Sequence, residues 1–239
     1  HPPVQPDAVQ VEPAGLPEIP IGPKRLDTVA ALLSDIDPVN RRLGLLRLGQ
    51  KADPANLSAL IQALPIETDS FLLAAELAVL KSFPGPEAFQ AALPFLHHKV
   101  DRVRANAAET LAGLNRSEAA PHLRPLLEDP DNRVQANAIL ALAQENAVDL
   151  LPTLKRLCSD SRELWRRSAL YIISSMPRPD LLPQIESLLG DVEPRVRDLA
   201  FEILGDFSKE GIPGAAQLRG KIEVRIQMER DRGHFFENT

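Results

Sequence analysis

The sequence predicts an all-α fold, a solenoid of about six helix pairs followed by a C-terminal capping helix. Repetition is the first reason, because sliding the chain against itself by 31 residues aligns similar residues without a gap. Two of the aligned columns are Val103, Val134, Trp165 and Val196, and Ala107, Ala138, Ala169 and Ala200. Composition is the second reason, because 44% of the 239 residues are hydrophobic but only 4% are aromatic. Leu, Ala, Ile and Val must therefore build the core, which favours helices over a β-sandwich.

Residues 1–23 contain seven prolines, three acidic residues and no Lys or Arg. Such a segment cannot bury an apolar face, so it is predicted to be an extended linker, with a proline-rich ligand as the alternative. The chain starts at His1 and not at Met, and is interpreted as a fragment or a processed product, from which a preceding signal or membrane anchor could have been removed. No run of about 18 apolar residues occurs, so no membrane span is expected in this segment.

Residues 24–209 are predicted to form the solenoid, and each repeat divides into two helices. In the first helices, apolar residues three apart share one face. Their columns are Leu123, Leu154 and Ile185, and Leu126, Leu157 and Leu188. In the second helices, a spacing of four residues from Val103 to Leu111 makes an apolar stripe that only neighbouring helices can cover. The early repeats deviate, because Val39 and Leu72 are 33 residues apart.

Residues 210–239 are predicted to be the C-terminal capping segment. Within them the stretch KIEVRIQMER, 221–230, alternates apolar and polar residues like a strand. Ile222 with Ile226 and Val224 with Met228 also fit helical spacing. Because the chain offers no other strand for pairing, the stretch is interpreted as a capping helix.

The columns resemble the HEAT repeat family, in particular the short bacterial type that also occurs in phycobilisome lyase subunits. The resemblance lies in an L-P-x-L-x-x-L pattern in the first helices, a turn Asp, and an R-V-R or R-V-Q opening of the second helix. The residues of the first pattern are Leu151, Pro152, Leu154 and Leu157, and Leu182, Pro183, Ile185 and Leu188. Residues 85–209 fit well and residues 24–84 weakly. Ankyrin and tetratricopeptide signatures do not occur.

The resemblance implies a right-handed α-solenoid whose second helices line the concave surface and whose first helices form the convex one. It also implies that the turn Asp bonds within a ladder between repeats. Arg104, Arg166 and Arg197 share a column that Gln135 interrupts, and they are the expected ladder partners of the turn residues. Those turn residues are Asp129, Asp160 and Asp191.

The sequence contains no recognisable catalytic or metal-binding motif, so we expect no enzymatic activity, no metal and no cofactor. Deoxyhypusine hydroxylases of this repeat type carry His-Glu pairs, and no His of this chain is followed by Glu. The adjacent His97 and His98 lack an identifiable third ligand. Cys158 has no second thiol and stands in a column of leucines, so it is interpreted as a buried apolar residue. A net charge of -6 disfavours nucleic acid as a partner.

Candidate partner-binding residues lie on the side of the second helices that points away from the core. At 100° per residue, the column of Glu109, Leu140, Tyr171 and Glu202 has this direction. Arg167 and a polar column that contains Asn106 and Asn137 lie beside it. Tyr and Arg are enriched among residues that dominate binding energy. The alternative is that Leu140 and Tyr171 pack between adjacent repeats.

The predicted function is therefore a non-enzymatic scaffold that binds a helix or extended peptide of a protein partner on its concave face. A cytoplasmic location is expected, and a tether through a missing N-terminal segment would make the chain the soluble part of a membrane-associated bacterial assembly. A lyase or chaperone-like accessory protein that holds a client and a small cofactor is the alternative. The sequence leaves the oligomeric state open.

Overall fold

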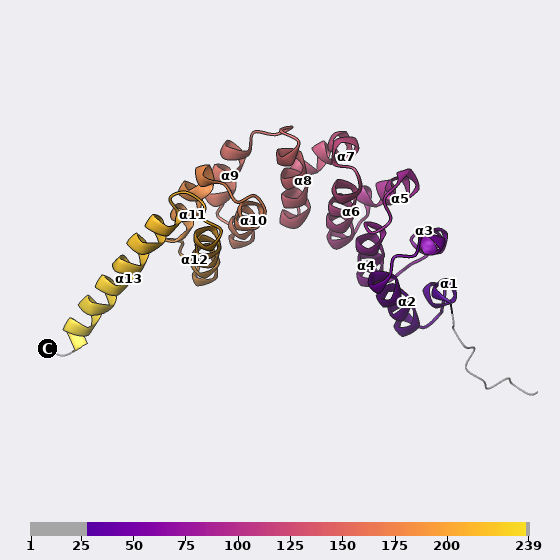
Figure 1. The fold of residues 1–239 in the computed structure, drawn as a ribbon, viewed down its shortest axis with the longest axis horizontal. Helices are drawn as coiled ribbons and strands as arrows, with labels where there is room; N and C mark the ends of the chain where they lie inside the picture. Colours follow the sequence, from indigo (N-terminus) through magenta and orange to yellow (C-terminus); the bar gives the residue numbers. More distant parts are fainter. Residues whose placement is uncertain (1–27, 238–239) are drawn as a thin grey trace, which may run out of the picture.

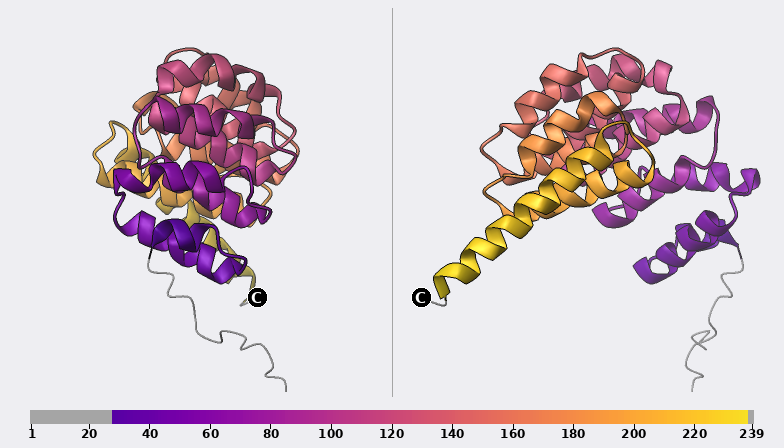
Figure 2. Two further views of the ribbon diagram at one scale, coloured as in Figure 1. Left: turned by 90° about the vertical axis from the view of Figure 1, so that its right-hand side faces the viewer. Right: turned by 60° about the vertical axis from the view of Figure 1, so that its left-hand side comes forward.

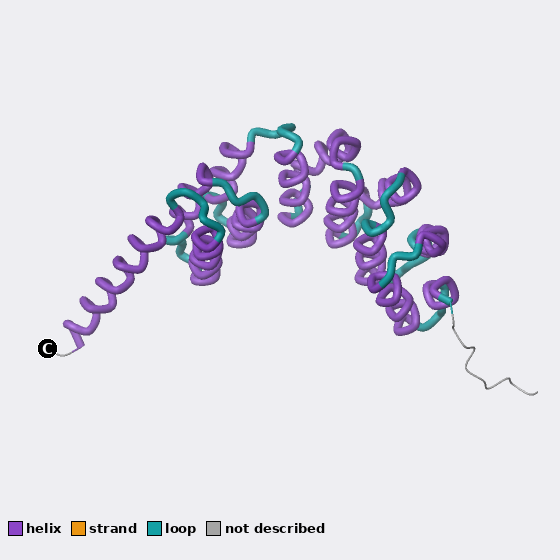
Figure 3. The backbone as a smooth tube through the Cα atoms, viewed as in Figure 1, coloured by secondary structure: helices purple, strands orange, loops and turns teal. Residues whose placement is uncertain are grey.

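The computed structural model describes the backbone of residues 28–237 and the side chains of residues 28–228. The predicted linker, residues 1–23, lies outside the described residues. The described part contains α-helices, short 3-10 helices and loops, and no strand (Figure 3). The α-helices are α1 (Val29–Leu33), α2 (Pro38–Gln50), α3 (Leu57–Ala63), α4 (Ser70–Leu80), α5 (Pro86–Ala92), α6 (Asp101–Leu114), α7 (Arg116–Leu123), α8 (Asn132–Gln144), α9 (Leu150–Cys158), α10 (Glu163–Ser174), α11 (Leu182–Leu188), α12 (Pro194–Lys209) and α13 (Ala215–Glu237).

The helices from α1 to α12 form six pairs that stand side by side in an arch (Figure 1). The second helix of each pair lines the inner side of the arch, and the first helix lies on the outer side. The predicted all-α solenoid of six helix pairs is confirmed, and so is the place of the second helices on the concave face.

Proline shapes the first helix α7. Pro121 lies inside α7, where it supplies no backbone N–H, and Pro125 follows soon after the end of α7 at Leu123. The chain continues as a 3-10 helix, Arg124–Glu128. Three of the second helices, α2, α4 and α8, begin after an Asp whose carboxylate caps their first N–H groups. The Asp131 carboxylate, for example, accepts hydrogen bonds from the N–H groups of Arg133 and Val134, each at 3.0 Å.

The buried apolar side chains form two clusters that meet in α8. The first cluster runs from α1 to α8 and includes Val134 and Leu142. The second runs from α8 to α13 and includes Ala136 and Ile139. Opposite faces of α8 therefore belong to different cores.

An arginine ladder joins successive repeats, as the resemblance implied. Nε and Nη2 of Arg104 donate to the two carboxylate oxygens of Asp129 at 2.8 and 2.9 Å. Arg166 and Asp191 repeat this arrangement at 2.6 and 2.7 Å, and both side chains are less than a tenth exposed. Charge-assisted forks of this kind combine strength with a defined geometry.

The ladder is interrupted at Asp160, and here the expectation of an inter-repeat partner is wrong. The guanidinium of Arg162, in the same turn, donates to the Asp160 carboxylate at 2.9 and 2.8 Å. Gln135 occupies the place of the preceding ladder arginine, and its amide donates to the carbonyl oxygen of Leu127. A Gln side chain supplies no guanidinium fork, so no ladder bond crosses from α8 to the turn before α10.

The ladder also includes the first repeat, which corrects the early register. Arg41 donates to both carboxylate oxygens of Glu67 at 2.6 and 3.0 Å. Arg41 therefore corresponds to Leu73, and Val39 corresponds to Phe71 instead of Leu72. Exposure agrees, because Val39 and Phe71 are 69% and 66% exposed.

The corrected register places a charged residue in a core position. Gly44, Glu76 and Ala107 are equivalent in three successive second helices, and Glu76 is fully buried. Both carboxylate oxygens lack a hydrogen-bond partner. Burial, and secondarily the nearby Glu67, raises the pKa of Glu76 to about 8.

The predicted helix at the C-terminus is present as α13, which begins earlier than the stretch 221–230. Ala215 and Leu218 are buried at its start and pack against the second core. Val224 and Met228, further along, are more than half exposed. Figure 2 shows that the helix continues past the arch and away from the other helices.

Candidate functional site

A hollow of about 410 Å³ opens on the concave side at the junction of α8 and α10. Residues from four second helices, α6, α8, α10 and α12, line it. They are Glu109, Asn132, Arg133, Ala136, Asn137, Leu164, Arg167, Ser168, Tyr171 and Leu199. The hollow lies at the junction where the two cores meet and where the arginine ladder is interrupted.

Local sequence explains why this junction opens on the concave side. Ala136 and Ser168 are small and buried, so they fill little of the space between the two helices. Beside the hollow, polar groups also join α8 and α10: the Asn132 amide donates to the Ser168 hydroxyl at 2.7 Å and to the Leu164 carbonyl at 3.3 Å.

Four of the seven predicted site residues come together in this hollow. They are Glu109, Asn137, Arg167 and Tyr171. The amide of Asn137 already donates to the Ala105 carbonyl of α6 at 2.9 Å, so its donor joins neighbouring repeats.

The other three predicted residues lie elsewhere. Leu140 is half-buried against the second core, so the alternative of packing between repeats describes Leu140. Asn106 donates to the Arg102 carbonyl of its own helix at 2.9 Å. Glu202 lines a different hollow, at the C-terminal end of the solenoid.

Tyr171 is the aromatic side chain of the hollow and is 43% exposed. Burial of the remainder, and then the charge of Glu109, raises the pKa of its hydroxyl, while Lys81 and Arg133 act in the opposite direction. The hydroxyl therefore keeps its proton and is available as a hydrogen-bond donor. A side chain that combines an apolar ring with a polar hydroxyl group is suited to a binding interface.

Two arginines give the hollow a local positive charge. Arg133 is exposed, and its guanidinium has no hydrogen-bond or ion-pair partner among the described residues. Arg167 is held only by a 3.6 Å contact with Glu163. The carboxylate of Glu109 is already paired with Lys81 at 2.8 Å. The hydrogen-bond donors of the hollow that remain available are therefore those of the two guanidinium groups, which can bind carboxylate or carbonyl oxygens.

Arg133 and Leu164, whose side chains line this hollow, were not predicted from the sequence. Both belong to one column with Phe71, Arg102 and Arg195, and the 31-residue offset reveals this column. Its side chains emerge near the start of each second helix, away from the columns that point directly opposite the core.

Other potentially reactive groups do not gather into a site. Cys158 is half-buried, and burial raises the pKa of its thiol to about 12, so the nucleophilic thiolate is not formed near neutral pH. The Nδ1 atom of His98 accepts a hydrogen bond from the Val100 N–H at 3.1 Å. In the described part of the chain, no group of three His, Cys, Asp or Glu residues could hold a metal ion. None of its helices has both the length and the apolar character needed to cross a membrane.

Comparison with known families and proteins shows the same architecture. Residues 89–173 match the family of HEAT repeats, and residues 181–210 match the HEAT repeat. No curated protein sequence matches the chain.

Solved structures that resemble the chain are helical repeat proteins. The Escherichia coli protein YibA is 18% identical with a TM-score of 0.52, over 74% of this chain and 69% of its own. The complex of CpcE and CpcF of phycocyanin lyase from Nostoc sp. PCC7120 is 18% identical with a TM-score of 0.48, over 93% and 99%. A designed armadillo repeat protein in complex with the peptide (KR)4 is 19% identical with a TM-score of 0.47, over 77% and 99%. At these identities the likeness concerns the fold and leaves function to the site.

Proposed function

We propose that the chain is a non-enzymatic scaffold that binds a segment of a protein partner on its concave face, because residues 89–173 and 181–210 match HEAT repeats. Helical solenoids of this type typically serve as interaction scaffolds, since their curvature creates extended concave surfaces. The observation that carries the proposal is the hollow between α8 and α10. There Tyr171 is exposed beside Arg133, which has no ion-pair partner among the described residues, and Arg167, which has only a 3.6 Å contact with Glu163.

The chemistry of the hollow describes the segment that would bind there. The ring of Tyr171 and the exposed side chain of Leu164 supply apolar contact area. Arg133 and Arg167 supply donors for acidic side chains or for backbone carbonyls. A short helix or extended peptide with an apolar residue next to an acidic one satisfies both requirements, and Tyr and Arg are the residue types that most often dominate such interfaces.

Affinity capture with three immobilised forms of the chain tests the proposal. They are the wild type, a concave double variant Tyr171→Ala with Arg167→Glu, and a convex control Leu151→Ala with Arg156→Glu that changes the same charge on α9. We expect a protein that is retained by the wild type and the control and reduced about tenfold or more by the concave variant. Circular dichroism must first show equal helix content in all three.

Equal retention by all three forms would refute the concave site. A retained chromophore, visible as absorbance of the purified wild type above 300 nm or so, would favour an accessory protein that holds a cofactor instead. Attachment to a membrane-associated assembly stays a prediction, and fractionation of cells that make the full-length protein tests it.

A further inference from the structure

The arginine ladder ends on Arg197 without a carboxylate. Arg41, Arg104 and Arg166 each donate from Nη1 to two carbonyls of their own turn, and from Nε and Nη2 to the carboxylate of the following turn. Arg197 keeps the first half of this pattern, with Nη1 at 2.7 Å from the Asp191 carbonyl and 3.0 Å from the Val192 carbonyl. Its Nε and Nη2 groups have no hydrogen-bond partner among the described residues.

The missing carboxylate follows from the course of α13. A seventh turn acid would stand 31 residues after Asp191, and that position is Ile222. Ile222 lies inside α13, which begins like a first helix and then continues unbroken to Glu237. The position where a seventh second helix would pack against α12 is therefore not occupied by any described part of the chain.

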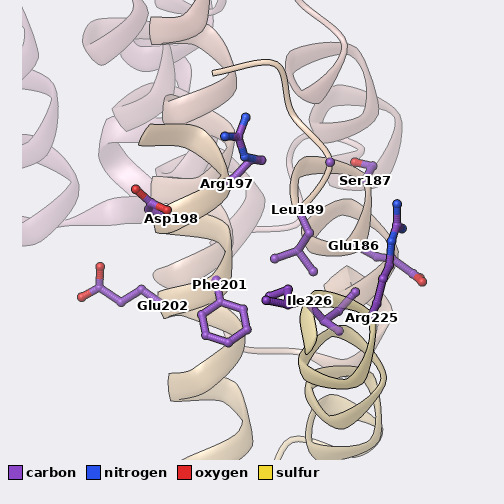
Figure 4. Close-up of a pocket in the computed structure, with 11 residues that line it drawn as sticks. Glu186, Ser187, Leu189, Arg197, Asp198, Phe201, Glu202, Arg225 and Ile226 are labelled. Carbon is purple, nitrogen blue, oxygen red and sulfur yellow. The ribbon is translucent and has the colours of Figure 1, made fainter. Parts of the chain in front are cut away.

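A second hollow, of about 640 Å³, lies at this position between α11, α12 and α13. Its apolar lining includes Leu189, Phe201 and Ile226, and Figure 4 shows these three side chains converging while Arg197 stands at one end. Phe201 is equivalent to Ile139 and Leu170, which are fully buried by the following repeat. Phe201 itself is only half-buried, because no following second helix covers it.

We propose that this end of the solenoid is a docking site for a helical segment of another protein, which places an Asp or Glu carboxylate on Arg197 and apolar side chains on Phe201 and Leu189. Such a segment takes the place of a seventh second helix. The site is separate from the concave hollow at α8 and α10, so it does not depend on the function proposed there.

The charge pattern sets the orientation of the segment. The guanidinium of Arg197 is preorganised, because two carbonyls already fix one of its nitrogens. A carboxylate that reaches Nε and Nη2 therefore forms a bidentate pair at little cost in side-chain entropy. The acidic side chains of Asp198 and Glu202 point away from the apolar residues of the hollow (Figure 4). These two carboxylates therefore do not face the apolar side of the segment, and the pair with Arg197 sets its orientation.

A peptide from the chain itself is a suitable probe. Residues 191–209, DVEPRVRDLAFEILGDFSK, carry a turn acid and a second helix that in the protein bring Asp191 to Arg166 of the preceding repeat. Fluorescence anisotropy with the labelled peptide and the full chain measures binding. We expect the wild-type peptide to bind about tenfold more tightly than the Asp191→Asn peptide, because one charge-assisted pair is lost.

Variants of the protein separate the two halves of the site. In Arg197→Gln the two peptides should differ less than twofold or so, because the group that distinguishes them is gone. Arg195→Gln, on the same helix and exposed, should bind both peptides like the wild type. Ile226→Lys changes an exposed side chain of the hollow without touching the ladder, and should abolish binding of both peptides.

Three results would overturn the proposal. The first is equal affinity of both peptides for the wild type, and the second is no binding at about 1 mM peptide, which is the weak limit for a specific contact. The third is self-association of the chain in sedimentation that Arg197→Gln removes, since a second copy would then be the occupant.

Discussion

Arg166 and Asp191 form a bidentate pair across the boundary of two repeats, with Nε–Oδ2 and Nη2–Oδ1 distances of 2.6 and 2.7 Å. The same guanidinium donates to the carbonyl of Asp160 at 2.9 Å, so one side chain joins the turns of two successive repeats. The hydrogen bonds from Arg166 hold the pKa of Asp191 below its usual range.

Removal of this pair should destabilise the chain strongly. Arg166→Gln leaves a buried carboxylate without its partner, and we expect a loss of about 3 kcal/mol in the free energy of unfolding. The matched control is Arg162→Gln, which removes the solvent-exposed pair with Asp160 and should change the stability far less than Arg166→Gln does. Urea denaturation followed by circular dichroism measures both. Similar losses for the two variants would contradict a special role of the buried pair.

The buried Glu76 should make stability fall as the pH rises. Its pKa is raised to about 8 in the folded chain, so the folded state holds a proton that the unfolded state releases from about pH 4.5 upward. Relative to Glu76→Gln, the wild type is expected to lose about 4 kcal/mol between pH 4 and pH 8, and the loss should be complete about one pH unit higher. Denaturation of both proteins at several pH values tests this prediction. If the free energy of unfolding varies with pH in the same way in both proteins, the prediction is wrong.

Restoration of the ladder at its interruption should stabilise the junction of α8 and α10. Gln135→Arg places a guanidinium where Arg104 and Arg166 stand in other repeats, within reach of Asp160. We expect a gain of about 1 kcal/mol, or a rise of roughly 3 °C in Tm. Gln144→Arg, which adds the same charge at the exposed end of α8, controls for net charge. The gain must disappear when Asp160→Asn is combined with Gln135→Arg; a gain that persists would mean that Asp160 is not the partner.

The thiol of Cys158 should be unreactive in the folded chain. Burial raises its pKa to about 12, so the thiolate fraction at pH 8 is smaller than in an unfolded chain by about 100-fold or more. Labelling with a disulfide reagent at pH 8, with and without urea, compares the two states. Comparable rates in the two states would show that the side chain is open to solvent.

The sequence predicted the repeated part of this molecule well because each repeat contacts mainly its neighbours. Identical offsets in the columns of Val103 and Ala107 therefore translate into equivalent positions in space. The ladder pair of Arg104 and Asp129 was implied by the resemblance to HEAT repeats, whose turn Asp bonds between repeats. The interruption of the ladder was harder to predict. Gln135 stands where other repeats have Arg, so Asp160 pairs instead with Arg162 of its own turn. This local pairing cannot be deduced from the aligned columns.

The candidate site was predicted in part. The direction of Tyr171 followed from helical spacing, whereas the fate of Leu140 depended on how closely two repeats approach. The hollow at Arg197 could not be predicted, because it depends on where α13 runs after Gly214. Glu76 stands 31 residues before Ala107, so the same offset places it in a core column. It was not predicted, because the aligned columns began at Val103 and Ala107 and the repeats before residue 85 fit the pattern only weakly.

The division of the core at α8 also bears on how the chain folds during synthesis. All buried side chains of the first cluster belong to residues up to Leu142, and Ala147 and Val148 pack against it just beyond. Once α8 has emerged from the ribosome, every buried side chain of this cluster is available, before the C-terminal helices have emerged. The amino-terminal half can bury its apolar surface early, and each later helix pair then adds to a folded template, which shortens the time for which apolar side chains are exposed to aggregation.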